Sequence, residues 1–562
     1  GGYYPKDPAL LSWRSQELLA LQVFPVAPGT EKQVEYTFTL PARYEGGRYH
    51  VHLPQLGTDA RVATYTLLPA HARDQLFVDD TPVVPGKKMT PGAEGITLAL
   101  GRHDAPWIEG RLGVARAGER AVMHFALDGA REFSAIPDGA HVVVVIDASR
   151  SRDVEALEAS HVAARAYLES FRRAARAPGS ERPRRGARVE LLSFDRTVHR
   201  HTRGFESTEK ALARLEGLGD HRGNGSAMDD ALAEAGRLLA RAPRGAARRV
   251  LVISDLELRD GLEAPRLAEL ARRTGAIVHV SQIMRGGDAA LLRFDDDDWD
   301  RVPRATGGLL WRASVDGSAR AIDDELRDVF EEWARPRRLD HVTLTAEGGP
   351  ELRHPQSFAE GDGYARFEIT DAPVRHVRLT AELWSEPVRE VFTPSRAEGD
   401  LWSALVFGDD LHEELSEAEM MPLARRGGAV SPVTSYLAIE PGVRPSTEGL
   451  DWGQGVGIGL GGRGRRVSRV HQARAKVAGA PPDRVGWLKE QLEKAWSACG
   501  GAQRAGAVTL ASTWREVVDV SRVEVRGAPE PVLQSCVLEA AWALELPEMF
   551  SQPRGAWDIP IG

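Results

Sequence analysis

Residues His141 to Ser151 join an apolar run to three oxygen-bearing side chains at alternating positions. A continuous, β-branched run of this kind predicts a strand that is buried on both faces of a parallel sheet. Asp147, Ser149 and Ser151 follow its carboxyl end, which is where open α/β sheets bind ligands. Carboxylate and hydroxyl oxygens are suitable ligands for a hard divalent cation.

One carboxylate and two hydroxyls carry too little charge to hold a divalent ion alone, so further ligands are expected elsewhere in the chain. Ser226 lies in a glycine-rich turn that opens a predicted helix, and Asp255 follows a second apolar run, Arg249 to Ser254. Neighbouring parallel strands end at the same edge of a sheet, so we expect Asp255 beside Asp147. The predicted metal ligands are Asp147, Ser149, Ser151, Ser226 and Asp255.

In this order, the three segments resemble the metal-ion-dependent adhesion site of the von Willebrand factor A family, which is Asp-x-Ser-x-Ser, a distant Thr and a further Asp. Ser226 stands in the place of the Thr and keeps its hydroxyl. The resemblance implies a Rossmann-like domain with a central parallel sheet over residues 139–335, closed by a helix from Ser318 to Trp333 with Ser318 as N-cap. It also implies a bound divalent cation, Mg²⁺ first, with Mn²⁺ or Ca²⁺ as alternatives. A domain of this fold with a dead site is the open alternative.

Alternating apolar and polar residues on both sides of this domain predict β structure, arranged as β-sandwich segments. Leu18 to Gly29 runs into the strict alternation Val34 to Leu40, which predicts a hairpin with a Pro-Gly turn. This pattern resembles the later part of the VIT domain, assigned to residues 1–138. That domain precedes a von Willebrand A domain in the heavy chains of inter-alpha-trypsin inhibitor. Residues 336–443 are expected to close the unit, with a β segment and a largely helical stretch from about Asp400 to Arg426.

The last 80 or so residues predict a small α+β domain. Residues 444–482 are rich in Gly and Arg and are interpreted as a linker, and residues 483–562 resemble the C-terminal domain of AgmX/PglI-type envelope proteins, a relative of the TonB C-terminal domain. Cys499 and Cys536 are the two cysteines of the chain, and we expect a disulfide between them, with two buried free thiols as the alternative. A disulfide indicates a location outside the cytoplasm.

Other features of the sequence do not indicate further binding sites or a membrane span. The two histidines of His199-Arg200-His201 are too close together for a zinc site, and we interpret this segment as a solvated edge. Asp295 to Asp300 lacks the Gly and the distal Glu of an EF-hand calcium loop, and we interpret it as a solvated acidic loop. A net charge of -9 over 562 residues argues against nucleic acid as a partner. No apolar run is long enough to span a membrane. The chain starts with Gly1-Gly2 and not with Met, so we expect it to begin within a longer protein.

These observations predict an adhesion or protein-binding module of the bacterial cell envelope, which binds an acidic residue of a protein ligand through a divalent cation. The location would be the periplasm, the outer membrane surface or the exterior, and the C-terminal domain would bind an envelope protein. A general base cannot be assigned beside the ion, so we expect no enzyme activity. A structural spacer or scaffold with an idle metal site, or a metal-dependent hydrolase, are the alternatives.

Overall fold

The computed structural model of the chain forms two compact units. One unit comprises residues 134–337, 383–386 and 478–562, and the other comprises residues 1–133, 338–382 and 387–477. The structure describes residues 9–16, 18–23, 28–29, 39–53, 64–90, 95–176, 184–259, 261–438, 483–501, 505–514, 518–527, 530–550 and 554–561.

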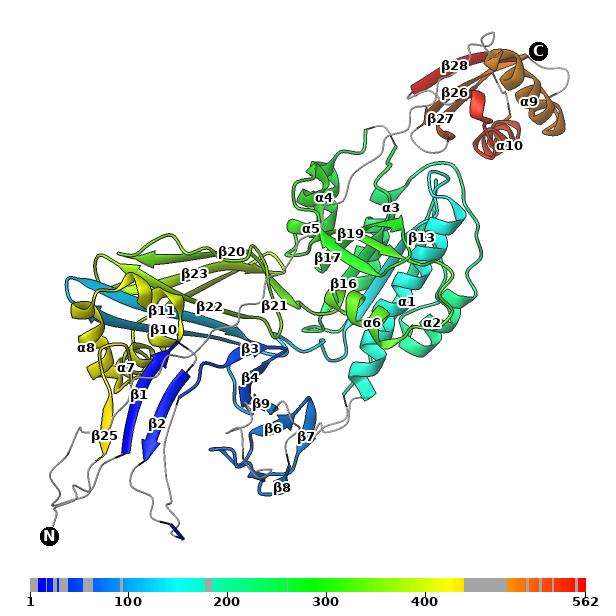
Figure 1. Ribbon diagram of the computed structural model, residues 1–562. Helices are drawn as coiled ribbons and strands as arrows, with labels where there is room; N and C mark the ends of the chain where they lie inside the picture. Colours follow the sequence, from blue (N-terminus) through cyan, green and yellow to red (C-terminus); the bar gives the residue numbers. More distant parts are fainter. Residues whose placement is uncertain are drawn as a thin grey trace, which may run out of the picture. The chain divides into compact units, whose positions relative to one another are not determined.

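An eight-stranded sheet forms the centre of residues 134–337, with strand order β14-β13-β12-β16-β17-β19-β18 and with β15 beside β13 (Figure 1). Its strands are β12 (His141–Asp147), β13 (Arg188–Phe194), β14 (Val198–Arg200), β15 (Glu206–Ser207), β16 (Arg248–Ile253), β17 (Ile277–Arg285), β18 (Ala290–Arg293) and β19 (Leu310–Val315). The five central strands are parallel, as predicted. The sheet as a whole is mixed, because β14, β15 and β18 join it antiparallel.

Helices cover both faces of this sheet, because β12 is apolar on both sides. Val142 and Val144 pack into one core with α1, α2 and α6, whereas Val143 and Val145 pack into another with α3, α4 and α5. The helices are α1 (Val154–Arg176), α2 (Thr208–Glu216), α3 (Met228–Leu239), α4 (Ala264–Arg273), α5 (Arg301–Arg304) and α6 (Asp324–Phe330), with 3-10 turns η1 (Asp298–Asp300) and η2 (Glu331–Trp333). The site at the end of β12 therefore stands on a rigid, close-packed base.

The closing helix begins later than the sequence predicts. α6 starts at Asp324, and its N-cap is Asp323, whose carboxylate accepts from the Leu326 N–H at 2.7 Å. Ser318 instead donates from its N–H and hydroxyl to the Asp316 carboxylate at 2.8 and 2.9 Å. The prediction of Ser318 as the cap was wrong because a nearby carboxylate holds Ser318 in a local turn.

The other unit is mainly β structure. Its sheets have the orders β10-β11-β22, β21-β20-β23-β24, β3-β4-β9-β6-β7, β2-β1-β25 and β5-β8. Strand β11 precedes the inserted α/β domain in the sequence and β22 follows it, yet the two pair along their length. The strands are β1 (Ala9–Ser15), β2 (Leu18–Val23), β3 (Arg43–Glu45), β4 (Arg48–Leu53), β5 (Tyr65–Thr66), β6 (Gln75–Val78), β7 (Thr81–Val83), β8 (Lys88–Met89), β9 (Ile96–Gly101), β10 (Ile108–Ala117), β11 (Arg120–Gly129), β20 (Arg338–Glu347), β21 (Phe358–Ala359), β22 (Gly363–Thr370), β23 (His376–Leu383), β24 (Glu386–Phe392) and β25 (Tyr436–Ala438).

Two predictions for this unit have different outcomes. The helical stretch is present as α7 (Arg396–Leu405) and α8 (Glu417–Gly427), with 3-10 turns η3 (Val406–Gly408) and η4 (Asp410–Glu414) between them. Strand β2 pairs with β1, and most of the alternating run that was expected to be its hairpin partner, residues 34–38 of 34–40, lies outside the described residues.

The C-terminal segment forms an antiparallel sheet with order β27-β26-β28 and two helices. Its elements are α9 (Arg484–Ala498), β26 (Gly506–Trp514), β27 (Val518–Arg526), α10 (Pro531–Trp542), η5 (Glu548–Phe550) and β28 (Arg554–Ile561). A disulfide joins Cys499 to Cys536, with the two Cα atoms 5.8 Å apart, so the predicted pairing is confirmed. The predicted linker, residues 444–482, lies outside the described residues. Within the described ranges, every helix is too short or too polar to cross a bilayer.

Candidate metal site at the sheet edge

Asp147 is the last residue of β12 and is fully buried. One carboxylate oxygen accepts from the Ser149 N–H at 2.9 Å, and the other accepts from the Ser254 hydroxyl at 2.6 Å. Ser254 follows β16, the neighbouring parallel strand. The carboxylate is thus fixed by two donors at the sheet edge where the sequence predicts the site.

The hydroxyls of the Asp-x-Ser-x-Ser motif lie next to each other, because the Ser149 and Ser151 Oγ atoms are 2.8 Å apart. The glycine-rich turn reaches the same place. Gly223 donates from its N–H to the Ala148 carbonyl at 3.0 Å, and it forms a parallel bridge with Ser149. The structure therefore joins the first two segments of the predicted site through backbone contacts.

Ser226 lies in this turn, just before α3, and is 3% exposed. Its hydroxyl oxygen is buried and has no hydrogen-bond partner among the residues that the structure describes. An unpartnered buried hydroxyl costs free energy, so this oxygen is a candidate to bind a ligand.

Asp255 comes directly after Ser254 and is half-buried. The chain turns sharply there, because Leu256 has a positive φ of 63° and the Glu257 N–H donates back to the Asp255 carboxylate at 2.9 Å. Burial raises the pKa of Asp147, the negative charge of Asp255 raises it further, and Arg152 opposes both effects. The two carboxylates therefore repel each other across the site.

This donor set fits a divalent cation. Such an ion would offset the repulsion between Asp147 and Asp255 and would give the Ser226 hydroxyl a partner. Asp147, Ser149, Ser151, Ser226 and Asp255 are the residues that would hold it. The sequence reasoning missed Ser254, which positions Asp147; a hydroxyl directly before Asp255 at a strand end was the available signal.

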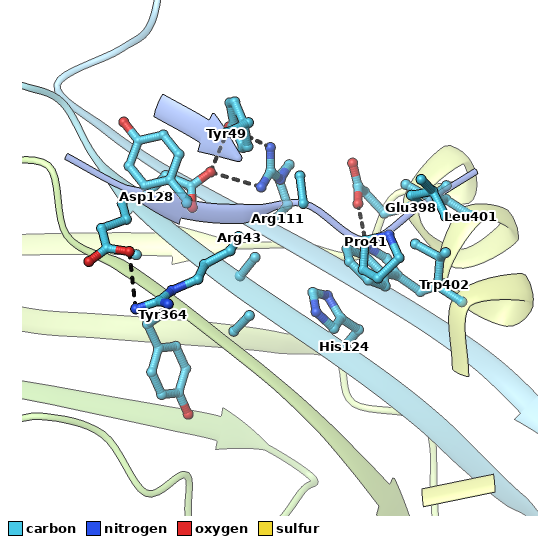
Figure 2. A pocket seen from close by; sticks show the side chains of 18 of the residues that line it. Pro41, Arg43, Tyr49, Arg111, His124, Asp128, Tyr364, Glu398, Leu401 and Trp402 are labelled. Atoms are coloured by element: carbon cyan, nitrogen blue, oxygen red, sulfur yellow. Dashed lines mark hydrogen bonds and ion pairs between the residues drawn. The ribbon is translucent and has the colours of Figure 1, made fainter. Parts of the chain in front are cut away.

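A separate cavity of about 470 Å³ is lined by strands β3, β4, β10, β11 and β22 and by helix α7 (Figure 2). In it the buried Asp128 carboxylate accepts from the Tyr49 hydroxyl at 2.7 Å and from Arg111 at 2.8 Å. The His124 ring stacks on Trp402 with centroids 3.3 Å apart, and burial lowers the pKa of His124 to about 3. Because the acid, phenol and guanidinium satisfy one another, we assign this network to stability and not to binding.

Comparison with known proteins identifies the region around the site. The family model described as von Willebrand factor type A domain matches residues 142–257. No curated protein matches the chain.

Several solved structures are similar at low sequence identity. The protein BatB from Bacteroides thetaiotaomicron is 15% identical over 35% of this chain and 99% of its own, with a TM-score of 0.24. The pilus adhesin SpaC from Lactobacillus rhamnosus GG, in its open conformation, is 11% identical over 52% of this chain and 48% of its own, with a TM-score of 0.28. Proximal thread matrix protein 1 from the mussel byssus, with a zinc-occupied adhesion motif, is 13% identical over 36% and 47%, with a TM-score of 0.26.

The resemblances to the VIT domain and to the AgmX/PglI-type domain remain predictions. The family match spans every segment that carries a predicted ligand, from β12 to the turn after β16. Residues 142–257 therefore belong to a von Willebrand factor type A domain.

Proposed function

We propose that this chain is a protein-binding or adhesion module, which binds an acidic residue of its ligand through a divalent cation. The residues that would hold the cation are Asp147, Ser149, Ser151, Ser226 and Asp255. The observation that carries the proposal is the pairing of two mutually repelling aspartates with an unpartnered buried hydroxyl. A cation at this place would offset the repulsion between Asp147 and Asp255, and it would bind the Ser226 hydroxyl.

The chemistry of the donor set favours a carboxylate ligand. Three of the five ligands are neutral hydroxyls, so the cation keeps enough positive charge to attract an outside Asp or Glu. Ser151 and Asp255 are partly exposed, whereas Asp147, Ser149 and Ser226 are buried. The exposed side of the cage is where a ligand carboxylate would complete the coordination, and the proposed role is binding without catalysis.

The proposed place of action is the bacterial cell envelope, outside the cytoplasm. The Cys499–Cys536 disulfide supports this location, because structural disulfides persist in oxidising compartments. We further propose that the C-terminal domain that contains this disulfide binds an envelope protein, by adding a strand at a sheet edge.

A thermal melt tests the cation site. The chelator-stripped chain is melted with and without Mg²⁺, Mn²⁺ or Ca²⁺, beside Asp147→Asn and the matched control Asp230→Asn. Asp230 is exposed on α3. A ligand that binds only the native state stabilises it by about 2.7 kcal/mol at a hundredfold excess over Kd. We expect this gain in the parent and in Asp230→Asn, and its loss in Asp147→Asn. Equal melts with and without metal would support the idle spacer.

Peptide selection tests the ligand class. Displayed random peptides are selected on the Mg²⁺-loaded chain and eluted with a chelator. We expect Asp and Glu to be enriched in the eluted peptides, and no enrichment when Asp147→Asn is the bait. Selected peptides without acidic residues would contradict carboxylate recognition while leaving the cation site intact.

A further inference from the structure

We propose that the same domain carries a second metal site, formed by Asp195, His199 and His221, which takes a borderline transition-metal ion such as Zn²⁺. One ligand atom of each residue lies within 4.8 Å of the others. The three come from the end of β13, from β14 and from the loop before α3. This inference concerns other residues than the proposed adhesion site and does not depend on it.

Asp195 provides a fixed centre for the cluster. It directly follows β13 and is 7% exposed. Its Oδ1 atom accepts from the Thr197 N–H at 2.8 Å and lies 3.3 Å from the Thr197 hydroxyl. A carboxylate held in this way loses little freedom when it binds an ion.

The two imidazoles approach the two oxygens of this one carboxylate. His199 Nε2 lies 3.1 Å from Oδ1, and His221 Nε2 lies 3.7 Å from Oδ2. The rings are 6.1 Å apart and nearly perpendicular, so they do not stack. Their side chains are 40% and 77% exposed, which leaves water access to the space between them.

These separations suit tetrahedral coordination. Zinc bonds of about 2.0–2.2 Å to nitrogen and oxygen place neighbouring ligand atoms roughly 3.4 Å apart. Each imidazole lies near this distance from one carboxylate oxygen, and small side-chain rotations would bring one atom of each residue, now within 4.8 Å of the others, to the ion. Two imidazoles and a carboxylate form a donor set that zinc uses with a fourth position open to water or an external ligand. Imidazole nitrogen favours Zn²⁺, Co²⁺, Ni²⁺ or Cu²⁺ over Mg²⁺ and Ca²⁺, so this site and the all-oxygen site would select different metals.

Glycine makes the close approach of the loop possible. A Cβ at Gly223 would lie 2.3 Å from Asp195 Oδ2, and one at Gly225 would lie 3.0 Å from Arg196 Cα. Gly225 also has a φ of +91°, which glycine adopts readily. The loop is therefore built to fit against Asp195, and His221 lies two residues before Gly223 in the same loop.

Of the two histidines in His199-Arg200-His201, only His199 belongs to this cluster. His201 is not part of it, because its Nε2 lies 2.8 Å from the Ser193 hydroxyl. The interpretation of His199 as a solvated edge rested on the close spacing of His199 and His201. The second imidazole comes instead from a distant loop, which spacing along the sequence does not reveal.

A metal titration tests the site in the full chain. The chelator-stripped protein is saturated with Mg²⁺ and then titrated with Zn²⁺ against a colorimetric zinc indicator, and with Co²⁺ while visible absorption is recorded. The variants are the double His199→Ala/His221→Ala, the matched control His201→Gln, and Asp147→Asn. Thermal melts without metal check that each variant folds.

We expect one Zn²⁺ equivalent to bind at least tenfold more weakly in the double variant, with loss of the intense Co²⁺ bands of a tetrahedral site. His201→Gln and Asp147→Asn should keep both signals. Equal zinc affinity in the parent and the folded double variant would overturn the proposal, and would show that these histidines contact Asp195 without sharing an ion with it. If the double variant does not fold, Asp195→Asn replaces it and must show the same loss.

Discussion

The adhesion motif after β12 and the histidine cluster after β13 occupy the same edge of one sheet, and their strands are neighbours. Asp147 is fully buried among oxygen donors, and the charge of Asp255 opposes its ionisation. Asp195 is also buried, but its carboxylate meets two partly exposed imidazoles. The first arrangement is costly without a cation. In the second, Asp195 already has hydrogen-bond partners in Thr197 and His199, and His221 approaches it at 3.7 Å as an ion-pair contact.

The two sites differ in the structural signs that indicate a bound ion. At the adhesion motif, the signs are two carboxylates that repel each other and a buried group without a hydrogen-bond partner among the described residues, the Ser226 hydroxyl. A half-exposed nitrogen and oxygen cluster reveals its ion only through ligand type and spacing. We therefore expect removal of metal to cost more stability at the adhesion motif than at the histidine cluster.

Gly223→Ala should have the widest effect, on stability and on both metal responses, because Gly223 contacts both sites. Its Cβ would overlap the Asp195 carboxylate, and its backbone bridges Ser149. We expect a loss of about 1–3 kcal/mol in the free energy of unfolding, as for other overpacked sites. The Mg²⁺ and the Zn²⁺ responses should both weaken. Gly245→Ala is a control in an open turn of positive φ, where strain occurs without a clash. A variant that loses only one metal response would show that the sites are mechanically separate.

Ser254→Ala should affect the adhesion motif alone. The hydroxyl donates to the buried Asp147 carboxylate at 2.6 Å and accepts from the Leu256 N–H at 3.0 Å. Hydrogen bonds to charged groups are worth about 1.5–3 kcal/mol, so chemical denaturation should show a loss of that size. Mg²⁺ should bind more weakly because Asp147 loses its support, while the zinc titration should stay unchanged. A weaker zinc affinity would mean that the two strand ends move together.

Much of the α/β domain follows from the sequence. The run Val142 to Ile146 is apolar at every position, which predicts a central strand, and polar residues at its end predict the site. The antiparallel edges were not predicted, because β14 and β15 are two or three residues long and carry little periodicity.

The histidine cluster could not be predicted, for a topological reason. Asp195 and His221 are neighbours because the glycine-rich loop folds onto the end of β13, where the Ala227 N–H donates to the Asp195 carbonyl at 2.7 Å. Contacts between a strand end and a distant loop depend on the tertiary fold and leave no local pattern. The same applies to the strand β28, whose partner β26 comes well before it in the chain.

Ser226→Ala should weaken Mg²⁺ binding about tenfold, which corresponds to about 1.4 kcal/mol. Without metal, the same variant should be as stable as the parent or slightly more stable, because it removes a buried hydroxyl that has no partner. Ser226→Thr keeps the hydroxyl and should retain most of the Mg²⁺ affinity. Isothermal titration and metal-free melts measure the two effects. Unchanged Mg²⁺ affinity in Ser226→Ala would remove this residue from the ligand set.

His201→Gln should have the smallest effect. His201 is half-buried and bonds to Ser193, and burial lowers its pKa below the usual value, with the nearby His199 charge as a second cause. Loss of a neutral hydrogen bond should cost about 1 kcal/mol, and glutamine can restore part of it. Zinc affinity should remain within twofold of the parent. His201 lies two residues from His199 on the same strand edge. If His201→Gln lost as much zinc affinity as His199→Ala/His221→Ala, the imidazoles of His199 and His221 would not be the ligands that determine zinc binding.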